Sequence, residues 1–146
     1  MKKEVMICMS GVMASASDEA VDIICPGEYY FRNGKHFIRY EEKIAEDSLK
    51  TDTVCMIKCD NKSAEVTKKG IVSSKLFYEP GQTHRISYAT EYGDFLIGIK
   101  TDALRLTESE HELLLEIDYA VEFESDEKNV FHIKIHVSDE PERVMA

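Results

Sequence analysis

Several side chains of this sequence combine a ring with a polar end and fall where strand alternation would direct them into the interior of a β-barrel. These are His36, Tyr40, His84, Tyr88 and Tyr119. If they converge, their hydroxyl and imidazole groups could orient a small, largely apolar ligand between apolar walls. The alternative is that each ring fills the core and bonds only to a neighbour or to water, since side chains can fill a small barrel entirely. The sequence leaves both interpretations open.

Motifs for covalent catalysis and for phosphate or cofactor binding are absent from the sequence. There is no G-x-S-x-G motif, and Ser73-Ser74 has no recognisable partner base. The seven glycines are scattered singly at turns, so the sequence contains no glycine-rich phosphate loop. We therefore expect no cofactor and no catalytic residue, and we favour a protein that is not an enzyme. An enzyme acting at the barrel mouth would require titratable groups that folding brings together in a cleft.

Residues of metal-binding type occur, but their spacing on strands does not suit a metal ion. His132 and His136 would lie about 13 Å apart on an extended strand, beyond the reach of one zinc ion. Glu116 and Asp118 would lie roughly 7 Å apart on one face, but a flat strand does not curve its ligands around a calcium ion. His111 falls in a polar loop with no evident partner. We therefore expect no metal site and interpret the acids as a solvated face.

The four cysteines do not form a metal-binding or redox motif. Cys55 and Cys59 fall within one predicted strand, where they would lie on the same face but about 13 Å apart. That separation is too large for a disulfide or a shared metal ion. We expect reduced thiols that pack as small hydrophobic groups.

The clearest structural pattern is the two-residue alternation over residues 112–138, which predicts a long antiparallel hairpin with one dry and one wet face. Matching the two dry rows leads us to expect Phe123 opposite Phe131. The same register would place Asp118 opposite His136 on the wet face. The apolar residues of one parity are Leu113, Leu115, Ile117, Tyr119, Val121, Phe123, Phe131, Ile133, Ile135 and Val137.

Further strands are predicted along the rest of the chain, separated by turn residues. Asn33-Gly34 is the strongest turn signal, because this pair tolerates the positive φ angles of a two-residue hairpin. Pro26-Gly27 predicts a bend or bulge, and residues 43–50 are interpreted as a loop. Short links without crossover helices predict an all-β fold, a single antiparallel meander of about 8–10 strands closed into one barrel domain over residues 1–146. The predicted strands are residues 4–12, 20–31, 36–42, 52–60, 63–69, 73–79, 83–89 and 95–106.

The composition is that of a folded domain with an acidic surface. The chain has 146 residues, of which 43% are hydrophobic, and this content argues against disorder. A net charge of −10 repels phosphate backbones and anionic lipids, so we expect neither nucleic acid nor a membrane as a partner. Glu4 and Ser10-Gly11 interrupt an N-terminal stretch that otherwise resembles a secretory signal, and we expect a cytoplasmic protein. The sequence does not predict an oligomeric state.

Three stretches of the sequence carry a family resemblance. Residues 27–42 form a hairpin pattern with Asn-Gly at its turn, residues 88–93 read Tyr-Ala-Thr-Glu-Tyr-Gly before an apolar strand, and residues 115–119 read Leu-Glu-Ile-Asp-Tyr. They resemble the second hairpin, the Tyr-x-Thr-Pro-Tyr-Gly turn and the penultimate strand of the bacterial YwiB-like proteins. Glu91 replaces the usual proline, and residues 109–111 replace a glycine-rich loop. The resemblance implies a calycin-like antiparallel barrel, related in shape to lipocalins and fatty-acid-binding proteins, and it supplies no catalytic residues.

Together these patterns favour a cytoplasmic, non-enzymatic barrel that binds a small, largely apolar molecule in its interior. The alternative is an interaction or structural module, with a barrel filled by side chains and an outer surface or rim that meets a partner protein. A continuous interior cavity of about a few hundred Å³ would favour the first hypothesis, and a packed interior would favour the second.

Overall fold

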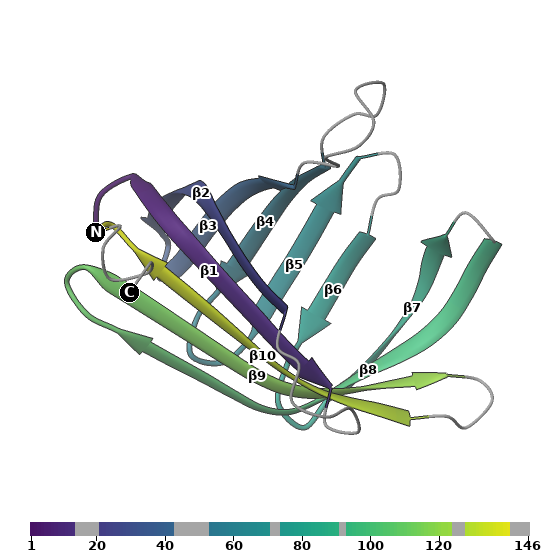
Figure 1. Cartoon of the computed structure of the whole chain (residues 1–146). Helices are drawn as coiled ribbons and strands as arrows, with labels where there is room; N and C mark the ends of the chain where they lie inside the picture. The colour runs from purple at the N-terminus through teal and green to yellow at the C-terminus, as the bar shows by residue number, and fades with distance from the viewer. Residues whose placement is uncertain (14–20, 43–52, 71–73, 91–92, 124–127, 141–146) are drawn as a thin grey trace.

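The computed structural model of the chain consists of ten β-strands joined by turns and loops (Figure 1). The described residues are 1–13, 21–42, 53–70, 74–90, 93–123 and 128–140, so the predicted loop at residues 43–50 lies outside them. The strands are β1 (Glu4–Met13), β2 (Val21–Arg32), β3 (Lys35–Glu42), β4 (Thr53–Cys59), β5 (Ala64–Lys69), β6 (Ser74–Tyr78), β7 (Thr83–Thr90), β8 (Gly93–Glu108), β9 (Glu112–Phe123) and β10 (Lys128–Ser138). The described residues contain no helix that is long and apolar enough to span a membrane.

All ten strands belong to one antiparallel sheet, whose hydrogen-bonded order is β6-β5-β4-β3-β2-β1-β10-β9-β8-β7. β1 pairs with both β2 and β10, so the first and last strands of the chain are neighbours. β6 and β7 form the two ends of the order, and the sheet curls until it is nearly closed into a barrel with a seam between them (Figure 1). The predicted all-β antiparallel barrel is confirmed.

The turn between β6 and β7 is fastened to β8. Gly81 N donates a hydrogen bond to Thr101 O at 2.9 Å, and Thr101 N donates to Gln82 O at 3.2 Å. The pairing of β8 with β9 shifts register between Thr101 and Ala103, as at a β-bulge. Bulges increase the local bend of a strand. The irregularity of β8 therefore begins at Thr101, the residue that is hydrogen-bonded to the turn between β6 and β7.

Two glycines, Gly34 and Gly27, show how the local sequence shapes the hairpin formed by β2 and β3. Asn33 and Gly34 adopt φ angles of 53° and 77°, as expected for the predicted two-residue turn. Of the bend or bulge expected at Pro26-Gly27, a bulge is absent, because Pro26 and Gly27 pair with Met6 and Val5 of β1 without a register shift. The pairing of β2 with β3 begins at Gly27 and Tyr40. A Cβ at Gly27 would lie 2.7 Å from Arg39 O and would also collide with Ile7. Glycine is therefore required there by the close approach of neighbouring strands.

The core lies inside the barrel and comes mainly from one parity of each strand, as the alternation predicts. Along β9, for example, Leu113, Leu115 and Ile117 are all almost completely buried. Cys55 and Cys59 are also fully buried, and all four cysteines are thiols. The other apolar residues that are at most 2% exposed, among those described, are Ile7, Ile38, Ile57, Ala64, Ile99, Ala120, Ile135 and Val137.

The register expected for the last hairpin is wrong. Phe131 lies opposite Tyr119 instead of Phe123, and Asp118 lies opposite His132 instead of His136. The parity of both strands is as predicted, so the same side chains face the interior. The observed register pairs the strands from Glu112 and Ser138 to Glu122 and Lys128. It allows the Tyr119 and Phe131 rings to stack with centroids 5.4 Å apart.

Candidate functional site

A cavity of about 330 Å³ lies inside the barrel. Among the residues whose side chains the structure describes, those that line it come from all strands other than β7 and β8. Small-molecule sites in proteins usually enclose about 300–1,000 Å³, so the volume is sufficient for a small ligand. Most of the wall is aliphatic: Ile57, Val66, Leu76, Ile117, Ile133 and Ile135 contribute to it.

Burial decreases from one end of the cavity to the other. Ile57, Ile117 and Ile135 are 1–2% exposed and form its deepest part. The next inward-facing residues on β9 and β10, Tyr119 and Ile133, are only partly buried. The cavity therefore has a dry, apolar floor and a wetter rim.

Polar groups are few and lie among these aliphatic walls. Tyr40 and Tyr78 are buried and Tyr119 is partly buried. The Tyr78 and Tyr119 hydroxyls are hydrogen-bonded to each other, and their rings meet edge-on with centroids 4.9 Å apart. Burial raises the pKa of Tyr119, while the hydrogen bond from Tyr78 and the positive charge of Lys68 lower it. Tyr119 therefore remains a neutral phenol that can donate or accept a hydrogen bond.

Lys68 is a cavity residue that the sequence analysis missed. It lies near the end of β5, is partly buried and follows the inward-facing residues Ala64 and Val66 at strand spacing. Of the described residues that line the cavity, Lys68 is the one with a formal charge. The parity of residues 64, 66 and 68 was the available signal, but a lysine near a strand end is usually read as solvated. Tyr78, also missed, shares parity with Leu76 on β6 in the same way.

Two of the five predicted site residues line this cavity. Tyr40 reaches it from β3 and Tyr119 from β9, strands that are not neighbours in the sheet. His36 is buried on the same face as Tyr40 but lies elsewhere, and His84 is absent from the cavity lining. Tyr88 lies on β7 opposite Phe95, and its side chain is outside the described residues.

His36 belongs to a second hollow, of about 340 Å³. Its Nδ1 atom lies 2.7 Å from the Tyr29 hydroxyl, and its Nε2 atom lies 3.0 Å from Glu108 Oε2. A proton on Nε2 satisfies both contacts, because Nε2–H then donates to the carboxylate while Nδ1 accepts from the phenol. Burial raises the pKa of Tyr29, with further contributions from the charges of Glu108 and Cys59. This hydrogen-bonded chain links β2, β3 and the end of β8.

His84 lies at the edge of the seam, away from both hollows. Its Nε2 atom is 3.4 Å from Glu79 Oε1, and its ring centroid is 5.5 Å from that of Phe77. These contacts span the turn between β6 and β7. His84 is partly buried, its Nε2 atom makes no hydrogen bond among the described residues, and these contacts do not bring it to the other predicted residues.

A larger, more open hollow of about 960 Å³ adjoins the interior cavity. It is lined by charged residues such as Glu4 and Arg39 together with inward-facing Cys25. Ile23 and Tyr40 line both spaces. These two side chains therefore lie between the outer hollow and the interior cavity.

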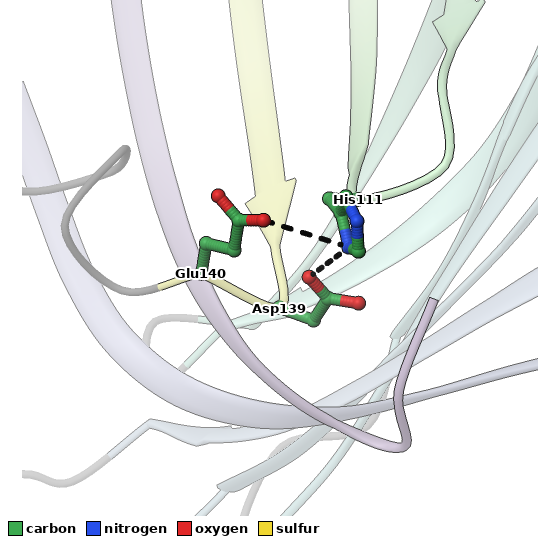
Figure 2. A group of neighbouring side chains, drawn as sticks. All are labelled: His111, Asp139 and Glu140. Carbon is green, nitrogen blue, oxygen red and sulfur yellow. Dashed lines mark hydrogen bonds and ion pairs between the residues drawn. The ribbon is translucent and has the colours of Figure 1, made fainter.

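The environment of His111 differs from the expectation that nothing surrounds it. Figure 2 shows His111 beside two carboxylates at the end of β10, with Nδ1 3.0 Å from Asp139 Oδ1 and 3.6 Å from Glu140 Oε1. The second oxygen of Asp139 accepts a hydrogen bond from Lys2 N at 2.9 Å. Three potential metal ligands thus lie within 4.8 Å of one another. Both oxygens of the buried Asp139 carboxylate thus have hydrogen-bond partners within the protein, Lys2 N and His111 Nδ1.

Fold and cavity together define the class: a nearly closed antiparallel β-barrel with an interior cavity of small-molecule size. A family described as a domain of unknown function, DUF1934, matches residues 7–135, and the chain belongs to this family.

The crystal structure of the ywiB protein from Bacillus subtilis is similar to this fold. The TM-score is 0.77 at 16% sequence identity, over 93% of this chain and 91% of that chain. At this identity the likeness establishes the fold alone. Together with the family match it confirms the YwiB-like resemblance of the sequence. Among curated proteins, no sequence matches this chain.

Proposed function

We propose that this barrel binds a small, largely apolar molecule in its interior cavity and catalyses no reaction. The cavity itself carries the proposal, because about 330 Å³ of space, open at one end, is lined mainly by aliphatic side chains. Transfer of apolar ligand surface from water into such a space favours binding by roughly 25 cal/mol per Å². Tyr40, Tyr78 and Tyr119 supply the few polar groups that would orient the ligand.

The alternative of a filled barrel acting only through its outer surface is less well supported. Side chains pack the barrel at the floor, where Ile57, Ile117 and Ile135 are 1–2% exposed, and the open space lies toward the partly buried Val66, Tyr119 and Ile133. The likeness in shape to lipocalin-type barrels agrees with interior binding but does not carry the proposal, since one fold serves many functions.

We further propose a cytoplasmic location, because Glu4 and Ser10-Gly11 interrupt the signal-like N-terminal stretch. The net charge of −10 supports the proposal that neither nucleic acid nor a membrane is a partner.

Native mass spectrometry of the protein purified from its natural host tests the proposal. We expect a mass adduct that is released on denaturation, or a rise in the thermal unfolding midpoint with one class of compound from a lipid and metabolite panel. A clean apo mass together with no stabilising compound would overturn the proposal.

A matched pair of variants locates the ligand. Val66→Phe introduces a larger, aromatic side chain into the cavity lining. Val121→Phe makes the same change at a partly buried residue outside that lining. We expect Val66→Phe to abolish the adduct and Val121→Phe to retain it. Circular dichroism would verify that both variants keep the β-sheet spectrum. Equal retention by both folded variants would place the ligand outside the cavity.

A further inference from the structure

The hydrogen-bonding edge of β7 faces the seam of the barrel. β6 and β7 are the two ends of the sheet order, and no described strand pairs with either of them across the seam. In Figure 1 the two strands diverge from the turn that joins them. β7 is the longer of the two edges, with eight residues against five in β6. An unpaired edge of this length can pair with another extended chain.

The pairing of β7 with β8 shows which backbone groups face the seam. Thr101 N donates a hydrogen bond to Gln82 O, and the register of the two strands is regular beyond this point. Residues of an antiparallel strand alternate between those that bond to one neighbour and those that point to the other side. The even-numbered residues of β7 therefore bond to β8, and the N–H and C=O groups of Thr83, Arg85 and Ser87 point toward the seam. All three residues are exposed.

Apolar side chains beside the seam are incompletely covered on the inner side of the sheet. Leu76 of β6 and Ile86 of β7 pack against the core but stay only partly buried. Ile57 and Ile117, each on the third strand from an end of the sheet order, are 1% exposed. Every second side chain of an added strand would face inward and cover Leu76 and Ile86. The inner side of the seam therefore favours a partner with apolar residues at alternate positions.

The outer side of the seam carries positive charge, in contrast to the whole chain. Arg85 of β7 and Lys100 of β8 make no ion pair among the described residues, whereas Lys75 of β6 is paired with Glu65 at 3.2 Å. Residues 64–90, which contain β5, β6 and β7, hold four Lys or Arg and two Glu, a net charge of +2 in a chain of net charge −10. This charge complements acidic side chains on the outer face of an added strand. A second copy of the chain would bring another Arg85 and a like overall charge, which disfavours self-pairing.

We propose that the free edge of β7 binds an extended segment of a partner protein, in which acidic residues alternate with apolar ones. The backbone of this segment pairs with Thr83, Arg85 and Ser87. Its apolar side chains cover Leu76 and Ile86 on the inner side, and its acidic side chains lie beside Arg85 on the outer side.

Two labelled peptides of eight residues, the length of β7, test this proposal. One alternates Glu with Val, and the other alternates Lys with Val. We expect fluorescence anisotropy to show that the acidic peptide binds at least about tenfold more tightly than the basic one, because charge-assisted contacts form only with the acidic peptide. Amide hydrogen exchange at Thr83, Arg85 and Ser87 should slow when the acidic peptide is bound, since added backbone hydrogen bonds protect these groups.

Three variants separate the backbone contribution from the charge contribution. Ser87→Pro removes one N–H that faces the seam and spares the bonds to β8, because proline is tolerated on an edge strand, and it should weaken binding at least about tenfold. Arg85→Glu should weaken binding of the acidic peptide about tenfold. Arg32→Glu makes the same change of charge at an exposed residue of β2 and should alter the affinity by less than about twofold. Circular dichroism would verify that each variant keeps the β-sheet spectrum.

Several results would overturn the proposal: no binding of the acidic peptide, equal binding of the two peptides, or full binding by folded Ser87→Pro protein. Equal effects of Arg85→Glu and Arg32→Glu would also overturn it. A wild-type dimer that Ser87→Pro dissociates, measured by native mass spectrometry, would assign the edge to a second copy instead. These outcomes are independent of binding in the interior cavity, which Val66→Phe tests separately.

Discussion

Tyr78 on β6 meets Tyr119 on β9 edge-on, with ring centroids 4.9 Å apart, although these strands are not neighbours in the sheet. Their hydroxyls are hydrogen-bonded to each other. β6 is one end of the hydrogen-bonded order, so no ladder holds its outer side. The tyrosine pair therefore connects β6 to β9, two strands that lie on either side of the seam, and forms part of the cavity lining.

Removing the hydroxyl of Tyr119 should have a small, measurable effect. We expect Tyr119→Phe to lower the free energy of unfolding by about 1 kcal/mol, through loss of one hydrogen bond, and Tyr119→Ala to lower it by about 3 kcal/mol, through loss of ring packing. Urea denaturation gives both values. Tyr30→Phe, at an exposed tyrosine, is the control and should change stability by less than about 0.5 kcal/mol. Equal losses at Tyr119 and Tyr30 would contradict a role for the pair.

Gly27 and Gly11 provide a matched comparison within the sheet. Gly27→Ala would place a Cβ 2.7 Å from Arg39 O and against Ile7, so we expect a loss of about 1–3 kcal/mol in the free energy of unfolding. Gly11→Ala would meet only His132 O, at 4.0 Å, and should be tolerated. Thermal unfolding of both variants distinguishes them, and a similar midpoint for the two would argue against the close approach at Gly27.

Thr101 allows a test of a buried hydroxyl. Its side chain is fully buried, and Oγ1 has no hydrogen-bond partner among the described residues. Valine has the same shape, so Thr101→Val should leave stability unchanged or raise it by up to about 1 kcal/mol. Ser87→Ala, at an exposed residue of the neighbouring strand, serves as a reference for a neutral hydroxyl deletion. A marked loss at Thr101→Val would indicate that the hydroxyl has a bound partner in solution.

Asp139 should make stability depend on pH in the acid range. The hydrogen bond from Lys2 N, followed by that with His111, holds the pKa of the Asp139 carboxyl below its ordinary value of 3.8. A carboxyl whose pKa is lowered by folding stabilises the protein above its ordinary pKa, and that contribution is lost as the pH falls through the folded pKa. Denaturant unfolding at a series of decreasing pH values should therefore show a shallower decline for Asp139→Asn than for the wild-type protein. Identical slopes would contradict the assignment.

Cys59 should be chemically inert in the folded protein. Burial raises the pKa of its thiol to about 12, with Asp60 adding to the rise and Lys35 opposing it. Because the thiolate is the reactive form, we expect iodoacetamide to alkylate the partly buried Cys8 well before Cys59. Peptide mass spectrometry of the native protein measures both sites.

The same raised pKa predicts a loss of stability at high pH. The folded state holds the Cys59 proton more tightly than the unfolded state, so this contribution is present below the ordinary value of 9.0 and is lost as the pH rises toward about 12. Early alkylation of Cys59 in the native protein would contradict both expectations.

Local patterns were sufficient to predict the strands, because side-chain alternation is a property of neighbouring residues. The predicted strand over residues 63–69 corresponds to β5 at Ala64–Lys69, and Asn33-Gly34 forms the predicted turn. The pairing register was not predictable in the same way. Parity requires only that Phe131 face the interior residues of β9, and both Tyr119 and Phe123 satisfy this.

The candidate site was predictable only in part. Tyr40 and Tyr119 were placed on the inner face by alternation, and both line the cavity. His36 has the same parity but lies at the Tyr29 and Glu108 hollow, because position along the barrel axis depends on strand stagger. The alternation of apolar and polar residues does not show how far along the barrel axis a residue lies.

The sequence by itself determined which residues form strands, which face of each strand is dry and the overall charge of the molecule, since all of these follow from composition and from contacts between near neighbours. Only the tertiary structure decided that β1 joins β10, that Lys68 and Tyr119 border one cavity, and that His111 meets Asp139. These relationships join residues far apart in the chain. They depend on register and closure of the whole sheet, which no local pattern encodes.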